Sequence, residues 1–216
     1  QAIGGCVLMY KKYVKRVLDL VFAVVLLVIL SPIMILATIA IKLEDPEGPV
    51  LFKQKRPGKN ANIFTVYKFR TMKVQTEKNG RPLSNIERIT KVGAFLRKIS
   101  IDELPQLFNI IRGEMSFIGP RPLLVEYLDY YTPEQMRRHE VMPGISGWAQ
   151  VNGRNAISWE EKFKYDVWYV DNMSFLLDLK IVFLTIYNIL KREGINNSKW
   201  DTMPLFTGSI QKGLNN

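Results

Sequence analysis

The sequence predicts an α+β protein that is attached to a membrane by one N-terminal helix. Three observations lead to this fold class. A run of 22 uncharged residues covers positions 20–41. Two segments with strand composition, residues 50–54 and 63–69, follow it, and several later segments place apolar residues at helical spacing. Roughly 170 residues follow the apolar run, which is the size of one ordinary domain.

The apolar run is long enough to reach across a bilayer, but a proline interrupts it near its centre. As a helix, its 22 residues would span roughly 33 Å, against a hydrocarbon core of about 30 Å. Pro32 has no backbone N–H and its ring crowds the carbonyl of Val28, so we expect a kink or a break there. The hydroxyl of Ser31 can donate to the carbonyl that loses its partner.

Basic residues flank the run on both sides, which leaves its topology open. Lysine and arginine mark the cytoplasmic side of a membrane segment. They are Lys11, Lys12, Lys15 and Arg16 before the run, and Lys42, Lys53, Lys55, Arg56 and Lys59 after it. Two alternatives remain: a kinked helix that spans the membrane, or a re-entrant helix that turns at Ser31-Pro32 and returns to the same face. A cleaved signal peptide does not fit a run of this length.

The composition favours anionic partners and excludes several classes of enzyme. The formal net charge is +10, and together with a membrane segment it favours lipid head groups and phosphorylated substrates over nucleic acid. Cys6 is the only cysteine and His139 the only histidine, which leaves almost no material for a zinc site or a Ser-His-Asp hydrolase. We expect His139, within a polar helical stretch, to lie at the surface. There is no Walker loop and no Gly-x-Gly-x-x-Gly motif.

The chain divides into few parts. We interpret residues 1–8 as a remnant of an expression vector ahead of Met9, so that the remaining chain has no cysteine, as suits a cytoplasmic face. Residues 9–43 are then the membrane helix, residues 44–205 a catalytic domain on the cytoplasmic face, and residues 206–216 a tail.

The elements of the domain follow from local patterns. Residues 50–54 and 63–69 predict a β-hairpin, residues 77–83 a polar loop, and residues 86–99 one helix with its apolar face at spacings of three and four. A second helix over 104–111 closes at Arg112-Gly113. Pro133 opens a polar helix, and residues 158–169 predict another. The apolar stretch 175–190 is too short to span a membrane and is either a core helix or an amphipathic helix in the membrane interface.

The strongest candidate for chemistry is the adjacent acidic pair Asp102-Glu103. Pro105 places the pair at the start of a helix, where carboxylates accept bonds from free N–H groups, so a helix cap is the structural alternative. Two adjacent carboxylates repel, and one that stays ionised can act as a nucleophile or bind magnesium. The pair is surrounded in sequence by basic residues, as phosphoryl transfer requires. These are Lys68, Arg70, Arg97, Lys98 and Arg112.

Two further segments carry candidate binding residues. Arg121 stands between Pro120 and Pro122, a rigid mount for a guanidinium that binds phosphate, or else a tight structural corner. Residues 143–154 combine three glycines with aromatic and amide side chains, which suits either a nucleotide-sugar-binding loop or a structural one. The candidates there are Trp148, Gln150, Asn152 and Arg154.

These segments, taken in this order, resemble the bacterial sugar transferase family, the monotopic phosphoglycosyl transferases. The matching pieces are Lys-Phe-Arg-Thr-Met at 68–72, Asp-Glu-Leu-Pro-Gln-Leu-Phe-Asn at 102–109, and residues 113–122 and 143–154. Each piece is weak alone, but their order and spacing are specific, and the likeness runs from about residue 9 to about residue 196. Residues 122–127 and 155–159 most closely resemble PglC, the initiating enzyme of Campylobacter-type N-linked protein glycosylation.

The resemblance implies a location, a mechanism and a cofactor. It implies a re-entrant helix broken at Ser31-Pro32, in the bacterial inner membrane with the catalytic domain on the cytoplasmic face. Asp102 would attack the β-phosphorus of a UDP-sugar, releasing UMP, and undecaprenyl phosphate would then take the sugar phosphate from the enzyme. Asp102 and Glu103 would hold Mg²⁺, and Glu103 would also help to move a proton. The expected phosphate contacts are Arg97, Arg121, Lys68 and Arg70, and the expected nucleotide-sugar contacts are Gln150, Asn152 and Arg154.

The resemblance favours diacetylbacillosamine as the sugar and an interfacial position for residues 175–190. The alternatives are another UDP-sugar, used for capsule or O-antigen synthesis, and a membrane scaffold that only binds polyprenyl phosphates. Besides donor, acceptor and bilayer, other enzymes of the same glycan pathway could be partners. Nucleic acid is not an expected partner, because no recognition motif is present.

Overall fold

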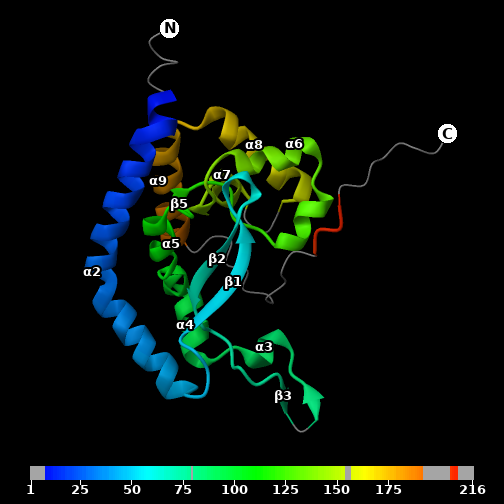
Figure 1. Cartoon of the computed structure of the whole chain (residues 1–216). Helices are drawn as coiled ribbons and strands as arrows, with labels where there is room; N and C mark the ends of the chain where they lie inside the picture. The colour runs from blue at the N-terminus through cyan, green and yellow to red at the C-terminus, as the bar shows by residue number, and fades with distance from the viewer. Residues whose placement is uncertain (1–7, 79, 154–156, 192–204, 209–216) are drawn as a thin grey trace, which may run out of the picture. The chain divides into compact units, whose positions relative to one another are not determined.

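The computed structural model describes residues 8–78, 80–153, 157–191 and 205–208, in a mixed arrangement of helices and small sheets (Figure 1). The mixed α and β class is confirmed. The expected vector remnant lies almost entirely outside the described residues. The chain forms two compact units, which we describe separately: unit 1 contains residues 1–18, 55–64 and 114–216, and unit 2 contains residues 19–54 and 65–113.

The helices and strands follow one another in a simple order. The α-helices are α2 (Lys15–Glu44), α3 (Asn85–Arg88), α4 (Lys91–Lys98), α5 (Gln106–Arg112), α6 (Pro133–Met136), α7 (Trp148–Asn152), α8 (Trp159–Asn172) and α9 (Phe175–Lys191). The π-helix is η1 (Tyr10–Val14), and the 3₁₀ helices are η2 (Lys59–Ala61), η3 (Ile101–Glu103), η4 (Val125–Tyr130) and η5 (Arg137–Glu140). The strands are β1 (Leu51–Pro57), β2 (Ile63–Phe69), β3 (Glu77–Lys78), β4 (Arg81–Pro82), β5 (Ser116–Ile118) and β6 (Gly144–Ser146).

The strands pair into three two-stranded sheets among the described residues. β1 pairs with β2 as the predicted hairpin, and β3 pairs with β4 in an antiparallel ribbon. β5 and β6 run parallel, with Ser116 opposite Gly144 and Ile118 opposite Ser146. A Cβ atom at position 144 would lie only 2.1 Å from the backbone N of Gly119, so the close approach of the two backbones requires glycine at this position.

The apolar N-terminal helix is continuous through Ser31-Pro32. The helix from Tyr10 to Glu44 is long and apolar enough to cross a membrane, with a mean hydropathy of 3.1 and only 11% of its most apolar window buried. The Ser31 hydroxyl donates to the carbonyl of Val28 at 2.8 Å, which confirms the predicted substitute for the bond that Pro32 cannot make. The ribbon of α2 changes direction along its length (Figure 1), so the proline bends the helix rather than ending it.

The last turn of α2 is attached to unit 2 by polar contacts. Both carboxylate oxygens of Glu44 accept from backbone N–H groups at the start of α4, those of Lys91 and Val92, at 2.7 and 2.8 Å. Ala37 and Ile41 of α2 pack with Phe69 and Leu96 in the core of this unit. The end of the membrane helix and the start of α4 are therefore one packed structure.

The first residues of the same helix are attached to unit 1. Tyr10 and Lys15 both donate to the Asp178 carboxylate, at 2.5 Å each, and Tyr169 donates to its other oxygen at 2.7 Å. Lys11 donates to the carbonyl of Val170 at the C-terminal end of α8. Lys11 and Lys15, which precede the apolar run, are thus bonded to other parts of the protein.

Helix α9 presents most of its apolar side chains to the outside. Asp178 and Ile181 are buried, whereas the large apolar residues are largely exposed. The exposed ones are Phe175, Leu176, Leu179, Val182, Phe183, Ile186, Tyr187, Ile189 and Leu190. This pattern favours the interfacial alternative over the core one.

Three predictions from local sequence were wrong. Residues 77–78 pair with residues 81–82 as the β3–β4 ribbon, in a segment that was predicted to be a loop. The single helix predicted over 86–99 is two helices, because Ile89 bridges Met72 and Thr90 is extended and caps α4 through its hydroxyl, which accepts from Gly93 N at 2.9 Å. His139 is not a surface residue but only 6% exposed, with Nδ1 placed 3.1 Å from the carbonyl of Gly58.

Candidate active site

The acidic pair lies on a short 3₁₀ turn whose apolar residues hold it to the core of unit 2. Ile101 and Leu104 pack against the cluster around Phe69 and Leu96, and they bracket Asp102 and Glu103. Because positions three apart share one face of a 3₁₀ turn, the two carboxylates between them are directed away from that apolar contact. The pair is partly exposed, as a site that receives a substrate requires.

A residue in the left-handed backbone conformation precedes the turn that carries the pair. Ser100 adopts a left-handed conformation with φ 58°, which is uncommon for a residue other than glycine. Pro105 serves as the N-cap of α5, and Gly113, with φ 79°, closes the same helix. The predicted helix end at Arg112-Gly113 is confirmed. The predicted start was too early: the helix was expected to begin close to Asp102-Glu103, but the acidic pair belongs to the separate turn η3, and α5 begins after Pro105.

Glu103 forms an ion pair with Lys68 of β2. The Lys68 Nζ atom lies 2.6 Å from Glu103 Oε1, and the two side chains are 26% and 18% exposed. A partly buried pair of this kind is screened less by salt than one at the surface. The structure thereby brings together two of the residues that the sequence identified separately.

Arg97 lies at the end of α4 and is oriented by a residue that the sequence analysis did not identify. Its Nε donates to the hydroxyl of Thr71 at 2.8 Å. Burial lowers the pKa of the Arg97 guanidinium, while the nearby Asp102 carboxylate raises it; the group stays protonated at neutral pH because an arginine does not lose its proton in proteins. Arg97 thus places a fixed positive charge close to Asp102.

Close backbone packing fixes α4 against the residues that follow β2. A Cβ on Gly93 would lie 2.1 Å from the carbonyl oxygen of Thr71, so only glycine permits the observed approach. On the other side, the fully buried Asn109 of α5 accepts from Tyr67 N at 3.1 Å and donates to Thr65 O at 2.7 Å. The acidic turn is therefore connected on both sides to elements that are fixed to β2.

Arg70 has a different environment from Lys68 and Arg97. Its guanidinium forms an ion pair with Asp45 and also donates to the backbone carbonyls of Asp45 and Pro49. Because the residue is only 7% exposed, it holds the turn that follows the membrane helix. Its predicted contact with substrate phosphate stays a prediction.

The remaining predicted site residues belong to unit 1. Arg121 is exposed, as the Pro-Arg-Pro mount suggests, and its backbone carbonyl accepts from Arg138 at 2.8 Å. Asn152 donates to the carbonyl of Trp148 within α7. The side-chain amide of Gln150 is buried and has no hydrogen-bond partner within the part of the chain that the structure describes. Arg154 lies outside the described residues.

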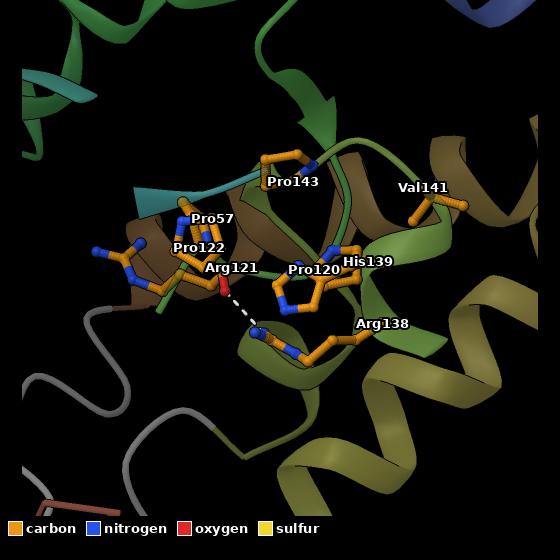
Figure 2. Close-up of a pocket in the computed structure, with 8 residues that line it drawn as sticks. All are labelled: Pro57, Pro120, Arg121, Pro122, Arg138, His139, Val141 and Pro143. Atoms are coloured by element: carbon orange, nitrogen blue, oxygen red, sulfur yellow. Dashed lines mark hydrogen bonds between the residues drawn. The ribbon is translucent and has the colours of Figure 1, made fainter. Parts of the chain in front are cut away.

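Prolines line a small pocket beside Arg121. Figure 2 shows Pro57, Pro120, Pro122 and Pro143 around it, together with Arg121, Arg138, His139 and Val141. The pocket has no room for a water molecule, so it is a packing defect rather than a ligand cavity. His139 contributes a neutral ring, because burial and, to a smaller extent, the charge of Arg138 lower its pKa to about 4.

Magnesium fits the acidic turn only if the substrate supplies further ligands. Among the described residues, no three His, Cys, Asp or Glu side chains form a group that could hold a metal. Mg²⁺ is commonly bound by one or two carboxylates together with substrate phosphates and water. The adjacent carboxylates of Asp102 and Glu103 are a donor set of that kind.

Comparison with known proteins identifies the family. The family model for the bacterial sugar transferase family matches residues 10–192. The uncharacterized sugar transferase EpsL of Bacillus subtilis (strain 168) is 55% identical over 195 residues, which cover 90% of this chain and 96% of EpsL.

Two further relatives have names that state a reaction. A UDP-N-acetylgalactosamine-undecaprenyl-phosphate N-acetylgalactosaminephosphotransferase of Aeromonas hydrophila is 44% identical over 82% of this chain and 44% of the relative. A UDP-glucose:undecaprenyl-phosphate glucose-1-phosphate transferase of Escherichia coli (strain K12) is 40% identical over 82% of this chain and 40% of the relative. The chain thus spans less than half the length of these two relatives. With the family model matching most of its length, the chain is a transferase that belongs to the bacterial sugar transferase family.

Proposed function

We propose that the protein transfers a sugar 1-phosphate from a UDP-sugar to undecaprenyl phosphate and releases UMP. The observation that carries the proposal is the turn Ile101–Glu103, which holds Asp102 and Glu103 beside the cations Lys68 and Arg97. The names of the related enzymes supply the donor and acceptor classes.

The transfer proceeds in two displacements at phosphorus. In the first, a carboxylate oxygen of Asp102 attacks the β-phosphorus of the donor, the bond to the bridging oxygen breaks, and UMP leaves with that oxygen. In the second, a phosphate oxygen of undecaprenyl phosphate attacks the same phosphorus and Asp102 is released as a carboxylate. A covalent intermediate divides one difficult displacement into two easier ones.

The neighbouring residues lower the activation free energy of both displacements by offsetting negative charge. Arg97 is held by Thr71, so its charge is already in place when negative charge develops on the phosphoryl oxygens. Lys68 forms an ion pair with Glu103 and so holds this carboxylate beside β2. Asp102 and Glu103 would hold Mg²⁺, which neutralises charge on the phosphates when it is bound.

The proposal also names the sugar that the enzyme transfers. The sequence resemblance favours N,N'-diacetylbacillosamine, in a pathway for N-linked protein glycosylation. The relatives named above act on N-acetylgalactosamine and glucose donors, and these sugars are the alternatives. A panel of UDP-sugars separates them.

For the membrane helix we propose the re-entrant topology, with the catalytic residues on the cytoplasmic face of the inner membrane. Its first residues are bonded to unit 1 through Asp178, and its last turn is bonded to unit 2 through Glu44. A spanning helix would leave its two ends on opposite faces of the bilayer. Basic residues flank the apolar run on both sides, which supports a return to the same face.

The test is the intact mass of the purified enzyme after incubation with Mg²⁺ and one UDP-sugar, without undecaprenyl phosphate. We expect a mass gain equal to the sugar phosphate with the correct donor, and none in the Asp102→Asn variant. Asp129→Asn, at an exposed carboxylate of η4, is the matched control and should form the adduct. UMP release that needs the acceptor and occurs without any adduct would replace the covalent mechanism with direct transfer. Neither adduct nor UMP with any donor would support a binding scaffold instead.

A further inference from the structure

Helix α4 packs between the apolar helix α2 and the residues proposed for catalysis, and all of these parts belong to unit 2. In Figure 1 it lies beside the end of α2, where its Leu96 packs with Ala37 and Ile41. Arg97 lies in the last turn of α4, and the turn Ile101–Glu103 begins shortly after the helix ends. The position of this eight-residue helix therefore bears on the site directly.

The start of α4 is held by the last residue of α2. The Glu44 carboxylate accepts from the backbone N–H groups of Lys91 and Val92 at 2.7 and 2.8 Å, across 47 and 48 positions of sequence. The hydroxyl of Thr90 accepts from Gly93 N at 2.9 Å. The first N–H groups of a helix have no partner inside the helix, and here one side chain of α2 supplies acceptors for two of them. The start of α4 is thus fixed to the end of α2.

The end of α4 is held by Thr71, which follows β2. The Thr71 hydroxyl accepts from Arg97 Nε at 2.8 Å, and its backbone carbonyl accepts from Thr90 N at 3.1 Å. A Cβ on Gly93 would lie 2.1 Å from the same carbonyl oxygen, so the backbones of α4 and Thr71 are in direct contact. Thr71 is only 6% exposed. One buried residue therefore contacts α4 both at its start and in its last turn.

The acidic turn is attached to the end of α4 by backbone hydrogen bonds. The carbonyl of Arg97 accepts from Ser100 N at 3.2 Å, and the carbonyl of Ser100 accepts from Glu103 N at 3.3 Å. Ser100 has φ 58°, in a region where the allowed range is small for a residue with a side chain. Ile101 packs in the same apolar cluster as Leu96 of α4. The orientation of α4 therefore determines where the acidic turn lies.

We propose that Glu44 and Thr71 are positioning residues, which hold α4 so that Arg97 and the acidic turn keep a fixed arrangement around the reacting phosphoryl group. The inference rests on the proposed function, since Arg97 and Asp102 act in that reaction. It gives the apolar helix a second role: through Glu44, the helix sets the geometry of the site in addition to attaching the protein to the membrane. Rates of displacement depend steeply on the placement of the reacting groups.

The first experiment measures kcat for UMP release, and KM for the donor, in Thr71→Val and Thr71→Ser with Mg²⁺ and undecaprenyl phosphate. Valine keeps the shape of threonine without the hydroxyl, whereas serine keeps the hydroxyl. We expect Thr71→Val to lower kcat about tenfold or more with a smaller change in KM, and Thr71→Ser to keep most of the activity.

The matched control is Thr90→Val, which also removes the hydroxyl of a buried threonine in contact with α4. This hydroxyl bonds to Gly93 N rather than to Arg97. Thr90→Val should lower the melting temperature through loss of a helix cap, while its kcat stays close to that of the wild type. Equal losses of kcat in Thr71→Val and Thr90→Val would show that only the stability of α4 matters.

A double-mutant cycle separates positioning from a general loss of structure. Arg97→Lys keeps the positive charge but lacks the Nε donor that bonds to Thr71. If Thr71 acts through Arg97, Thr71→Val should cause no further loss of kcat in the Arg97→Lys protein. Additive losses, or a wild-type kcat in Thr71→Val alone, would refute the role of Thr71.

The second experiment tests Glu44 without any substrate. Amide hydrogen exchange of the detergent-purified full chain, followed by mass spectrometry, measures the protection of residues 91–98 and 99–104. Glu44→Gln should speed exchange in both segments, by about fivefold at the start of α4, because an amide has one acceptor oxygen instead of two. Glu47→Gln, at an exposed carboxylate, makes the same change of charge and should leave both segments unchanged. Unchanged exchange in Glu44→Gln, or faster exchange in 91–98 alone, would refute the role of Glu44.

The two proposals fail in distinguishable ways. Hydrogen exchange needs no turnover, so a wild type that is inert with every donor would refute the proposed function and still leave the connection from Glu44 to the acidic turn measurable. If the wild type forms the Asp102 adduct and Thr71→Val and Glu44→Gln form it at the same rate, the proposed function stands and the positioning roles do not.

Discussion

Lys68 and Glu103 illustrate how the fold combines residues that are 35 positions apart. An amide at position 68 would retain hydrogen bonding but remove the charge beside the acidic pair. We expect Lys68→Gln to lower kcat/KM for UMP release by about 10- to 100-fold, the range for loss of one hydrogen bond to a charged group.

The matched control for this prediction is Lys53→Gln, at an exposed lysine of the paired strand β1. Its activity should stay within about twofold of the wild type, since exposed charges away from a site contribute little. Equal losses in the two variants would show that net charge, rather than the contact with Glu103, determines the rate.

His139 provides a prediction about stability against pH. Its pKa in the folded protein is about 4, below the ordinary 6.5, because burial disfavours the imidazolium. As pH falls from 6.5 towards 4, the unfolded chain takes up a proton that the folded chain does not. The contribution of His139 to the free energy of unfolding is therefore fully present above pH 6.5. It is lost as the pH falls through 4, by up to about 3 kcal/mol in total.

Denaturant unfolding at pH 7.5 and pH 4.5 measures this loss. The wild type should lose more stability between the two values than His139→Gln does, since the amide cannot titrate and the other groups titrate in both proteins. Identical losses in the two proteins would mean that His139 does not contribute to the pH dependence.

Single residues were predicted well where their chemistry is local and poorly where a distant partner decides it. Ser31 was predicted to bond to Val28 and does so, because a proline in a helix frees a carbonyl within the same turn. Arg70 was expected to contact substrate phosphate, and this stays a prediction; its bonds to Asp45, 25 residues away, were not predicted. His139 looked exposed because its neighbours are polar, but tertiary packing against Gly58 buries it.

At the scale of elements, a short described segment near the C-terminus is bound by an aromatic cluster. Phe206 is 3% exposed, and its ring centre lies 5.0 Å from that of Phe163 and 5.6 Å from that of Tyr127. Trp159 is a third neighbour at 5.7 Å. The tail predicted from residue 206 thus starts with a residue of the hydrophobic core.

We expect Phe206→Ala to destabilise the protein by about 3–5 kcal/mol, the usual cost of removing a buried phenylalanine. The adjacent Leu205 is 70% exposed, so Leu205→Ala is a control with nearly the same place in the chain and should change stability by less than about 0.5 kcal/mol. Thermal or denaturant unfolding of both variants decides the matter. Equal stability of both variants would show that the segment is not part of the core.

Helices and strands were predicted correctly where nearby residues in the sequence set their ends, and wrongly where a distant contact sets them. The β1–β2 hairpin, α5 and α8 have strand or helix patterns with local turn and cap residues, and all were predicted. The interval from residue 86 to residue 99 has one apolar periodicity but two helices, because the bridge from Ile89 to Met72 interrupts it. A long-range backbone contact of that kind leaves no local signal.

At the scale of the whole molecule, the apolar helix was predicted correctly from the sequence, but the contacts that hold its two ends were not. Lys11 and Lys15 were counted as basic flanks that report topology, whereas they bond to Val170 and Asp178. Glu44, which caps α4, had no predicted role. Anchored ends are a property of tertiary structure, and the pattern of charges in sequence cannot distinguish them from charges that face lipid head groups.

The anchored ends lead to a prediction about membrane topology. Single cysteines at Lys12 and Glu47, both exposed, would be introduced into a chain in which Cys6 is replaced by serine. With a re-entrant helix, a membrane-impermeant maleimide should label neither cysteine in intact spheroplasts and both in inside-out vesicles. A spanning helix predicts that spheroplasts label one position and inside-out vesicles the other. Because each position is compared with itself in the two preparations, a difference in reactivity between the two sites cannot imitate either result.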